Sequence, residues 1–406
     1  MRVLLTSWGS RGDVEPLAGL AVALRELGAE ARVAAPPDEE FRVLLERAGV
    51  PLVPLGPTVA SIVVRPKPPT HADAFRLAPE LVTARFETLL PAAEDCELVL
   101  ATGLMPAGAR DVAEKLGIRY RLACFHTLGL PSRHFPPGAR PGKQSAEGET
   151  DNRVLWRQDA ERVNALYGEA LNRHRAELGL PPVDDVRGHV LGDRPMLAAD
   201  PLLWPGQDRT DLELEQTGAW ILPDTRPLPD GLAEFLDAGE PPVYVGFGSM
   251  AAFAPKDIAR VATEAGRALG RRVLLASGWA GLTAIDEAED CFVVGDVNQQ
   301  ALFPRVAAVV HHGGAGTTQA AARAGAPQLV VPRIADQPSW AARVAELGIG
   351  TAHPDPEPTV ESLSAALAGA LAPAVRERAA TVAGTIRHDG AQVAARLLLD
   401  GADRPA

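Results

Sequence analysis

The sequence predicts an α/β protein with two Rossmann-like domains, each built on a parallel sheet. Three observations support this prediction. The chain has 406 residues, which is more than one ordinary hydrophobic core holds. Strand-like apolar runs alternate with segments of helical periodicity, as is typical of parallel sheets covered by helices. A short strand that runs into glycines and then into a helix begins at residue 2 and again at residue 242.

In the first half, the alternation defines strands and helices in turn. Strands are predicted at residues 2–6, 31–35, 98–101 and 120–124, and helices at residues 16–27, 39–48 and 108–116. Gly28 and Gly49 follow the first two helices, where glycine commonly ends a helix. The Pro-rich segments 63–70 and 134–142 cannot form regular elements, so we expect long loops on the binding side of this domain.

In the second half, the same order returns. After the strand and glycines of residues 242–249, a helix is predicted at 255–269 and strands at 272–276, 292–294, 307–310 and 328–331. The Pro-rich stretch before this half has the composition of a linker, and two facing sheets would leave a cleft between them. We therefore expect a first domain at 1–205, a linker at 206–230, a second domain at 231–385 and a C-terminal helix at 386–406 that packs back toward the first domain.

The composition excludes several classes of function. The formal net charge is -12 and no basic run occurs, which argues against nucleic acid and anionic membranes as partners. No apolar segment reaches the length of a membrane span and no signal sequence is recognised, so we expect a cytoplasmic protein. Cys96, Cys124 and Cys291 are far apart, and no histidine pair has ligand spacing, so we expect no disulfide and no metal site.

The stretch WGSRGDVEPL, residues 8–17, places a carboxylate at the end of the first strand. Open parallel sheets bind ligands at this edge, which makes Asp13 a candidate general base. Alternatively, Asp13 only caps the helix that follows, and Glu15 is a rival base. Ser10 lies at the tip of the turn and could reach a phosphate, whereas Arg11 could pair with a diphosphate or with Asp13.

Two further strand-to-helix turns carry polar side chains. HHGGAGTT, residues 311–318, combines glycines with a helix start whose N–H groups and dipole favour a phosphate, and His312 adds a side chain able to carry a proton. The alternative is a plain turn with glycines for packing. In DQP, Asp336 and Gln337 could bind vicinal sugar hydroxyls, or Asp336 could be only a helix cap.

The order of these motifs is similar to that of the GT-B family 1 glycosyltransferases. The motifs are the glycine loop with Asp13, GFGS at 246–249, NQQALF at 298–303, HHGGAGT at 311–317 and DQP at 336–338. Connecting segments such as LGLPPVDDV, LAADPLL, QTGAWILPD and RVAELGIG resemble the vancomycin- and teicoplanin-type glycopeptide glycosyltransferases. The resemblance covers nearly the whole chain and implies a GT-B fold with an acceptor-binding first domain and a nucleotide-sugar-binding second domain.

The resemblance also implies the reaction and its residues. An acceptor hydroxyl attacks the anomeric carbon with inversion, Asp13 is the base, and His312 with the helix dipole neutralises the leaving diphosphate without a metal or another cofactor. The implied donor-binding residues are Ser10, Arg11, Gly12, Ser249, Trp279, Val297, Gln299, His312, Gly314, Gly316, Thr317, Asp336 and Gln337. Many relatives have Trp-x-Pro-Gln where this chain has Asp-Val-Asn-Gln at 296–299. Trp279 could supply the missing aromatic wall or be a core residue, and Val297 could read the base through its backbone.

The resemblance implies the classes of donor and acceptor but not a single substrate for either. The intact glycine motif followed by DQP resembles members that use UDP-glucose or UDP-N-acetylglucosamine, and a dTDP-deoxyaminosugar of the vancosamine type is the alternative donor. The implied acceptor is a crosslinked heptapeptide aglycone or its monoglycosylated pseudoaglycone, bound by the loops at 55–80 and 126–150. A dehydrogenase is disfavoured because GSRGD lacks the G-x-G-x-x-G spacing. A 2-epimerase of UDP-N-acetylglucosamine and a non-catalytic sugar-nucleotide-binding helper remain as other classes.

Overall fold

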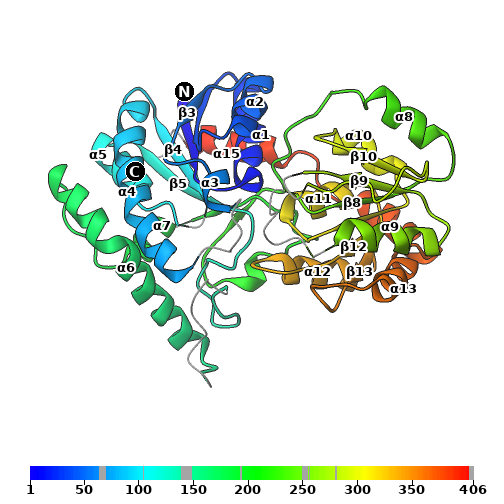
Figure 1. The fold of residues 1–406 in the computed structure, drawn as a ribbon. Helices are drawn as coiled ribbons and strands as arrows, with labels where there is room; N and C mark the ends of the chain where they lie inside the picture. The colour runs from blue at the N-terminus through cyan, green and yellow to red at the C-terminus, as the bar shows by residue number, and fades with distance from the viewer. Residues whose placement is uncertain are drawn as a thin grey trace.

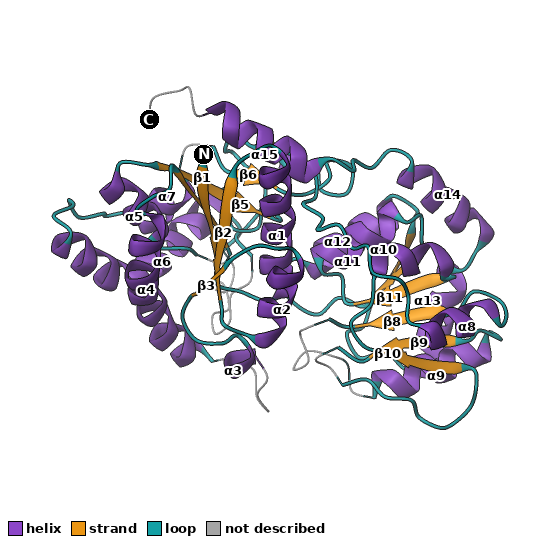
Figure 2. Cartoon of the chain, turned by 90° about the horizontal axis from the view of Figure 1, so that it is seen from above, coloured by secondary structure: helices purple, strands orange, loops and turns teal. Residues whose placement is uncertain are grey.

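The computed structural model describes residues 1–63, 70–103, 105–138, 149–192, 194–248, 255, 257–278 and 281–401. These residues form two α/β domains that lie side by side in Figure 1, the first in blue to green and the second in yellow to orange. Each domain contains one parallel sheet with helices on both faces, as Figure 2 shows from above. The sequence prediction of two Rossmann-like domains is therefore confirmed.

Within the described residues, the sheet of the first domain has seven strands, and neighbouring strands are parallel. In spatial order the strands are β3 (Leu52–Pro54), β2 (Glu30–Ala35), β1 (Arg2–Ser7), β4 (Leu98–Thr102), β5 (Arg119–Cys124), β6 (Met196–Leu197) and β7 (Glu215–Gln216). The central strands β1 and β4 are almost continuous apolar runs because helices cover both of their faces. The order of the strands switches between β1 and β4, since β2 and β3 lie on one side of β1 and β4 to β7 lie on the other. Parallel sheets bind ligands at the carboxyl ends of the strands beside such a switch point.

Helices bury the two faces of this sheet in separate apolar clusters. The helices of the first domain are α1 (Arg11–Glu26), α2 (Glu39–Arg47), α3 (Ala60–Val63), α4 (His71–Ala93), α5 (Ala109–Leu116), α6 (Asn152–Glu177) and α7 (Val186–Leu191), with a 3₁₀ turn η1 (Gln207–Arg209). The C-terminal helix α15 (Gly390–Asp400) also belongs here, because its alanines and Leu398 pack into the same cluster as α1. Figure 1 shows this helix in red beside α1.

The second domain repeats the strand order with six strands. They are β10 (Cys291–Val294), β9 (Val273–Ala276), β8 (Val243–Gly246), β11 (Ala308–His311), β12 (Gln328–Val330) and β13 (Gly350–Ala352). Its helices are α8 (Asp230–Asp237), α9 (Ile258–Ala268), α10 (Gln299–Leu302), α11 (Ala315–Arg323), α12 (Gln337–Glu346), α13 (Val360–Ala370) and α14 (Pro373–Ala383), with a 3₁₀ turn η3 (Phe303–Arg305). Here the strand order reverses between β8 and β11.

Another apolar cluster joins the two domains. Leu203 and Trp204 come from the first domain, whereas Trp340 and Ile349 come from the second. The domains are thus docked through buried apolar side chains.

Several predicted boundaries need correction. The first helix begins at Arg11 and not near Pro16, because Ser10 and Asp13 form a capping box that starts it earlier. Helix α4 occupies much of the predicted acceptor loop 55–80, since Thr70 and Asp73 form another capping box. Strand β7 lies inside the predicted linker 206–230 and forms the edge of the first sheet. In the part of the chain that the structure describes, no helix has the length and apolarity needed to cross a membrane.

Candidate active site

Asp13 lies in the first turn of α1, directly after the central strand β1. The backbone N–H of Ser10 donates a hydrogen bond to Asp13 Oδ2 at 2.9 Å, so the carboxylate does cap its own helix. Burial, with a smaller contribution from the negative charge of Asp336, raises the pKa of Asp13 to about 6 against the effect of this bond. The interaction with Asp336 shows that the second domain faces this carboxylate. A cap alone does not account for a side chain with this pKa and this neighbour.

Gly9 makes room for the Asp13 carboxylate. A Cβ on Gly9 would lie 2.2 Å from Asp13 Oδ2, which is far inside contact distance. The glycine that looks like an ordinary turn residue in the sequence is therefore required by the position of the carboxylate. Glu15, the rival base, is instead bonded to Arg11 at 2.6 Å.

His311 and His312 have different environments although they are adjacent. His311 is fully buried at the end of β11, where its ring bonds Gln328 Oε1 at 2.9 Å and accepts the Gly313 N–H at 3.1 Å. This pairing fixes the neutral tautomer with the proton on Nε2, and burial lowers the pKa of His311 to about 3. His311 is thus a structural residue that holds the turn.

His312 has a different environment, with its ring centroid 6.5 Å from that of His311. Burial lowers its pKa to about 4, although the charge of Asp336 acts in the opposite direction, so the ring is neutral at neutral pH. Its Nδ1 is buried and meets no hydrogen-bond partner among the described residues. The ring lies over Gly314, where a Cβ would come within 2.6 Å of Nε2. A neutral imidazole with an unused nitrogen can bind a ligand oxygen there.

Helix α11 begins beside His312. The first intrahelical hydrogen bond runs from Thr318 N to Gly314 O, so the amides of Gly316 and Thr317 lie in the first turn and lack intrahelical partners. Thr318 Oγ1 bonds Gly314 O at 2.9 Å and is used within the helix. The turn therefore offers N–H groups and the positive end of the helix dipole to an anion.

Asp336 and Gln337 are both partly committed to structural bonds. Asp336 Oδ2 accepts the Trp340 indole N–H at 2.7 Å, and Gln337 Oε1 accepts the backbone N–H groups of Arg333 and Ile334 at 2.9 and 3.1 Å. These bonds leave Asp336 Oδ1 and the Gln337 amide nitrogen for a ligand. The electrostatic effects of Asp336 on Asp13 and His312 bring the three predicted residues together at the domain interface.

Arg11 has partners that the sequence did not predict. It does not pair with Asp13, but bonds Glu15, Glu40 at 3.1 Å and Asp296 of the second domain at 2.8 Å. Asp296 also meets Arg47 and Arg226. Arg11 therefore joins the domains in this structure, and no pattern in the sequence links residues 285 positions apart.

The remaining predicted donor residues are placed as follows. The side chain of Val297 is buried in an apolar cluster of the second domain, which leaves only its backbone for a ligand. Gln299, the first residue of α10, is hydrogen-bonded to the Tyr244 side chain. Gly12 is exposed in the first turn of α1. Ser249 and Trp279 lie outside the described residues.

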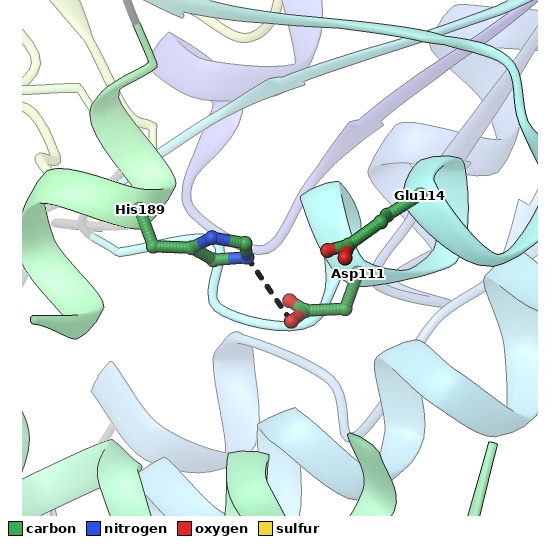
Figure 3. Close-up of side chains that lie close together, drawn as sticks. All are labelled: Asp111, Glu114 and His189. Carbon is green, nitrogen blue, oxygen red and sulfur yellow. Dashed lines mark hydrogen bonds and ion pairs between the residues drawn. The ribbon is translucent and has the colours of Figure 1, made fainter. Parts of the chain in front are cut away.

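A cluster of potential metal ligands lies elsewhere, among the helices α5, α6 and α7. Figure 3 shows His189 pointing toward Asp111, with Glu114 beside them. Arg175 bonds Asp111 at 2.6 Å and Glu114 at 2.8 Å, while His189 Nε2 lies 3.1 Å from Asp111. Burial would raise the pKa of Asp111, but His189 and Arg175 outweigh it and lower the pKa. The cluster contains its own positive charge and has the composition of a buried ion network.

Comparison with known proteins agrees with this geometry. Residues 286–393 match the family model of the erythromycin biosynthesis protein CIII-like C-terminal domain. The chain is 54% identical to vancomycin aglycone glucosyltransferase of Amycolatopsis orientalis over 100% of this chain and 98% of that protein. It is 50% identical to dTDP-epi-vancosaminyltransferase of the same organism over 98% of this chain and 97% of that protein.

Solved structures share the fold. The crystal structure of the kitacinnamycin glycotransferase superposes with a TM-score of 0.73 at 21% identity and covers 98% of each chain. This likeness supports the arrangement of two domains, while the curated relatives show the family. The chain is therefore a glycosyltransferase of GT-B family 1 and belongs to the vancomycin-type glycopeptide glycosyltransferases.

Proposed function

We propose that this glycosyltransferase inverts the anomeric centre as it moves a hexose from a nucleotide-diphosphate sugar to a hydroxyl of a glycopeptide aglycone. The observation that carries the proposal is the partly buried Asp13 carboxylate, whose pKa is raised to about 6 and on which the charge of Asp336 in the second domain acts. A base with this pKa is ionised at neutral pH and still accepts a proton readily. It lies at the strand edge where parallel sheets bind ligands.

In the proposed step, Asp13 takes the proton of the acceptor hydroxyl. The acceptor oxygen bonds to the anomeric carbon while the bond from that carbon to the phosphate oxygen breaks. The nucleoside diphosphate leaves with the bonding electron pair from the opposite face. We assign its negative charge to the first turn of α11 and to His312, whose Nδ1 is otherwise unused within the described chain.

We propose UDP-glucose or UDP-N-acetylglucosamine as the donor. The relative named as a vancomycin aglycone glucosyltransferase supports a hexose, and Asp336 and Gln337 each retain one polar atom for a sugar hydroxyl. A dTDP-deoxyaminosugar is the second candidate, because a dTDP-epi-vancosaminyltransferase is 50% identical. The acceptor we propose is a crosslinked heptapeptide aglycone or pseudoaglycone, and we propose the cytoplasm as the place of reaction.

We also propose that the transfer needs no metal ion, because His312 and the dipole of α11 can stabilise the leaving diphosphate. Single-turnover rates should be unchanged in excess EDTA. Loss of the single-turnover rate that Mg²⁺ restores would contradict this proposal.

A matrix of donors and acceptors tests the substrate assignment. UDP-glucose, UDP-N-acetylglucosamine and a dTDP-aminodeoxysugar are each paired with vancomycin- and teicoplanin-type aglycones, and products are identified by mass spectrometry and by the anomeric coupling constant in NMR. We expect a UDP-hexose to react fastest with inversion. A deoxysugar donor preferred tenfold or more would favour the second candidate, and nucleotide binding without any diphosphate release would indicate a helper protein.

A further inference from the structure

Asp336 stands at the start of α12, yet its carboxylate does not cap that helix. The side chain makes no capping bond to the helix backbone, and Oδ2 instead accepts the indole N–H of Trp340, four residues later, at 2.7 Å. An i,i+4 pair lies on one face of a helix, so the two side chains meet without distortion of the backbone. The indole N–H can only donate and does not ionise, which makes it a fixed partner for a charged carboxylate.

Burial makes this bond difficult to replace. Trp340 is 0% exposed, so water cannot reach its N–H, and without Asp336 this donor would be buried unpaired. Its ring is fixed by the apolar cluster that joins the domains. A fixed ring defines the direction of its N–H, and the N–H in turn defines the orientation of the Asp336 carboxylate.

A side chain of the first domain packs against the Trp340 ring. Trp204 lies 4.7 Å from Trp340 between ring centroids, and its own Nε1 donates to Thr127 Oγ1 at 3.2 Å. Thr127 follows β5 in the first domain, whereas Trp340 belongs to the second. A series of contacts therefore runs from a loop of the first domain to the carboxylate of Asp336.

Asp336 also acts electrostatically on the candidate catalytic residues. Its charge acts on both Asp13 and His312. One oxygen of the carboxylate is thus held by a fixed indole, its charge influences the residues that would perform the transfer, and Oδ1 is left for a ligand.

We infer that Trp340 is a positioning residue of the transfer reaction, whose indole N–H holds the Asp336 carboxylate so that its second oxygen binds a hydroxyl of the donor sugar. This inference rests on the proposed role of Asp336 toward the donor. Trp340 itself does not touch the substrate, and it acts only through Asp336.

The test is Trp340→Phe, which keeps an aromatic ring and removes the N–H. With UDP-glucose, we expect kcat/KM to fall about ten- to a hundredfold, in the range for loss of a hydrogen bond to a charged group. With monodeoxy analogues of UDP-glucose, the loss should become small for the analogue that lacks the hydroxyl bound by Asp336. In an Asp336→Ala background, Trp340→Phe should change kcat/KM less than twofold.

Trp220→Phe is the matched control, because Trp220 is 2% exposed and its Nε1 donates to Thr217 Oγ1 at 2.9 Å on the α1 side of the first domain. It should leave donor selectivity unchanged. Equal losses from Trp340→Phe in both backgrounds, or equal losses with all donors, would mean that Trp340 only fills space and would overturn the inference. Full activity of Asp336→Ala with every donor would instead overturn the proposed role of Asp336.

If Trp340→Phe does not fold, NMR of the Trp340 indole in the wild-type protein tests the same inference. In ¹⁵N-tryptophan-labelled wild-type protein, we expect the Trp340 indole N–H to exchange slowly and to shift when UDP-glucose is added. In Asp336→Asn protein the same signal should move upfield. If the chemical shift of the Trp340 indole N–H changes neither with Asp336→Asn nor with UDP-glucose, the inference is overturned.

Discussion

At the residue scale, the Asp13 carboxylate serves two purposes in the first turn of α1. Its bond from Ser10 N–H favours the charged form and starts the helix, while burial and Asp336 favour the protonated form. The second effect is larger, because the pKa rises to about 6. A helix cap that is also poised to exchange a proton is the residue that catalysis at neutral pH requires.

Asp13→Asn separates these two purposes, because an amide oxygen still accepts the Ser10 N–H but cannot take a proton. We expect kcat to fall by about 10²–10⁴ with little change in donor affinity. Asp73→Asn is the control, since Asp73 occupies the same capping position in α4, where it bonds Thr70 N–H at 2.8 Å. If Asp13→Asn retains full kcat, Asp13 is only a cap.

The raised pKa of Asp13 also predicts the acid limb of the pH profile. The base form exists above the pKa, so kcat/KM should decrease about tenfold for each pH unit below about 6 and level off above it. His312 does not produce this limb, because burial lowers its pKa to about 4. A profile without an inflection between pH 5 and 7 would contradict this assignment; stopped-time product assays in constant ionic strength provide the measurement.

At the element scale, the turns after β1 and β11 are shaped by the side chains they carry. The strand-and-glycine pattern predicted these turns and, from the rule that parallel sheets bind ligands at their carboxyl edge, predicted Asp13 and His312 as neighbours of the site. Helix α1 begins earlier than the sequence predicts, because Ser10 caps it and Pro16, which favours a helix start, lies in its second turn.

No sequence pattern comparable to the strand-and-glycine pattern predicts the other features of the site. Nothing in HHGG distinguishes His311, which bonds Gln328, from His312, because the difference arises from the face of the strand to which each points. The bond between Asp336 and Trp340 has the i,i+4 spacing, but its importance depends on the burial of the indole by Trp204. Tertiary contacts of this kind form only when distant parts of the chain fold together, so no local sequence pattern predicts them.

Gly314→Ala tests the tight packing of the β11 turn. The backbone at Gly314 has φ -64 and ψ 142, which alanine adopts easily, so the only conflict is the 2.6 Å approach to His312 Nε2. We expect a displaced His312, a donor KM raised about tenfold or more, and a stability loss of about 1–3 kcal/mol. Gly168→Ala in α6 is the control, where a Cβ would lie 3.9 Å from Val186 and alanine should slightly stabilise the helix. Unchanged donor KM in Gly314→Ala would remove His312 from the donor site.

At the scale of the whole molecule, the two domains are held by an apolar cluster and by a separate ion network. In the cluster, Trp204 of the first domain packs against Trp340 of the second, with the two rings tilted by 48°. In the network, Asp296 bonds Arg11 at 2.8 Å and Arg226 at 2.7 Å, with Arg47 beside them. Arg11 and Asp13 share the first turn of α1, so the network and the candidate base lie on one rigid element. Domain docking and base position are therefore coupled.

Asp296→Asn tests this coupling. Partial burial works against the charge of Asp296, but Arg11 and Arg226 outweigh it and lower its pKa to about 2, so ordinary pH changes do not neutralise it. Salt does weaken exposed pairs, because the screening length is about 8–10 Å at 0.10–0.15 M ionic strength. We expect the substitution to increase the radius of gyration at low salt to the value that the wild type reaches at high salt, as measured by small-angle X-ray scattering.

The matched control for that experiment is Asp286→Asn, since Asp286 pairs with Arg267 at 2.7 Å within the second domain and has no ion pair with the first domain among the described residues. At every salt concentration, the radius of gyration of this variant should equal that of the wild type. If Asp296→Asn also leaves it unchanged at low salt, the apolar cluster around Trp204 and Trp340 holds the domains by itself. If the radius increases, the three arginines that lose their shared carboxylate repel one another, and the donor KM should increase together with the radius because α1 moves with Arg11.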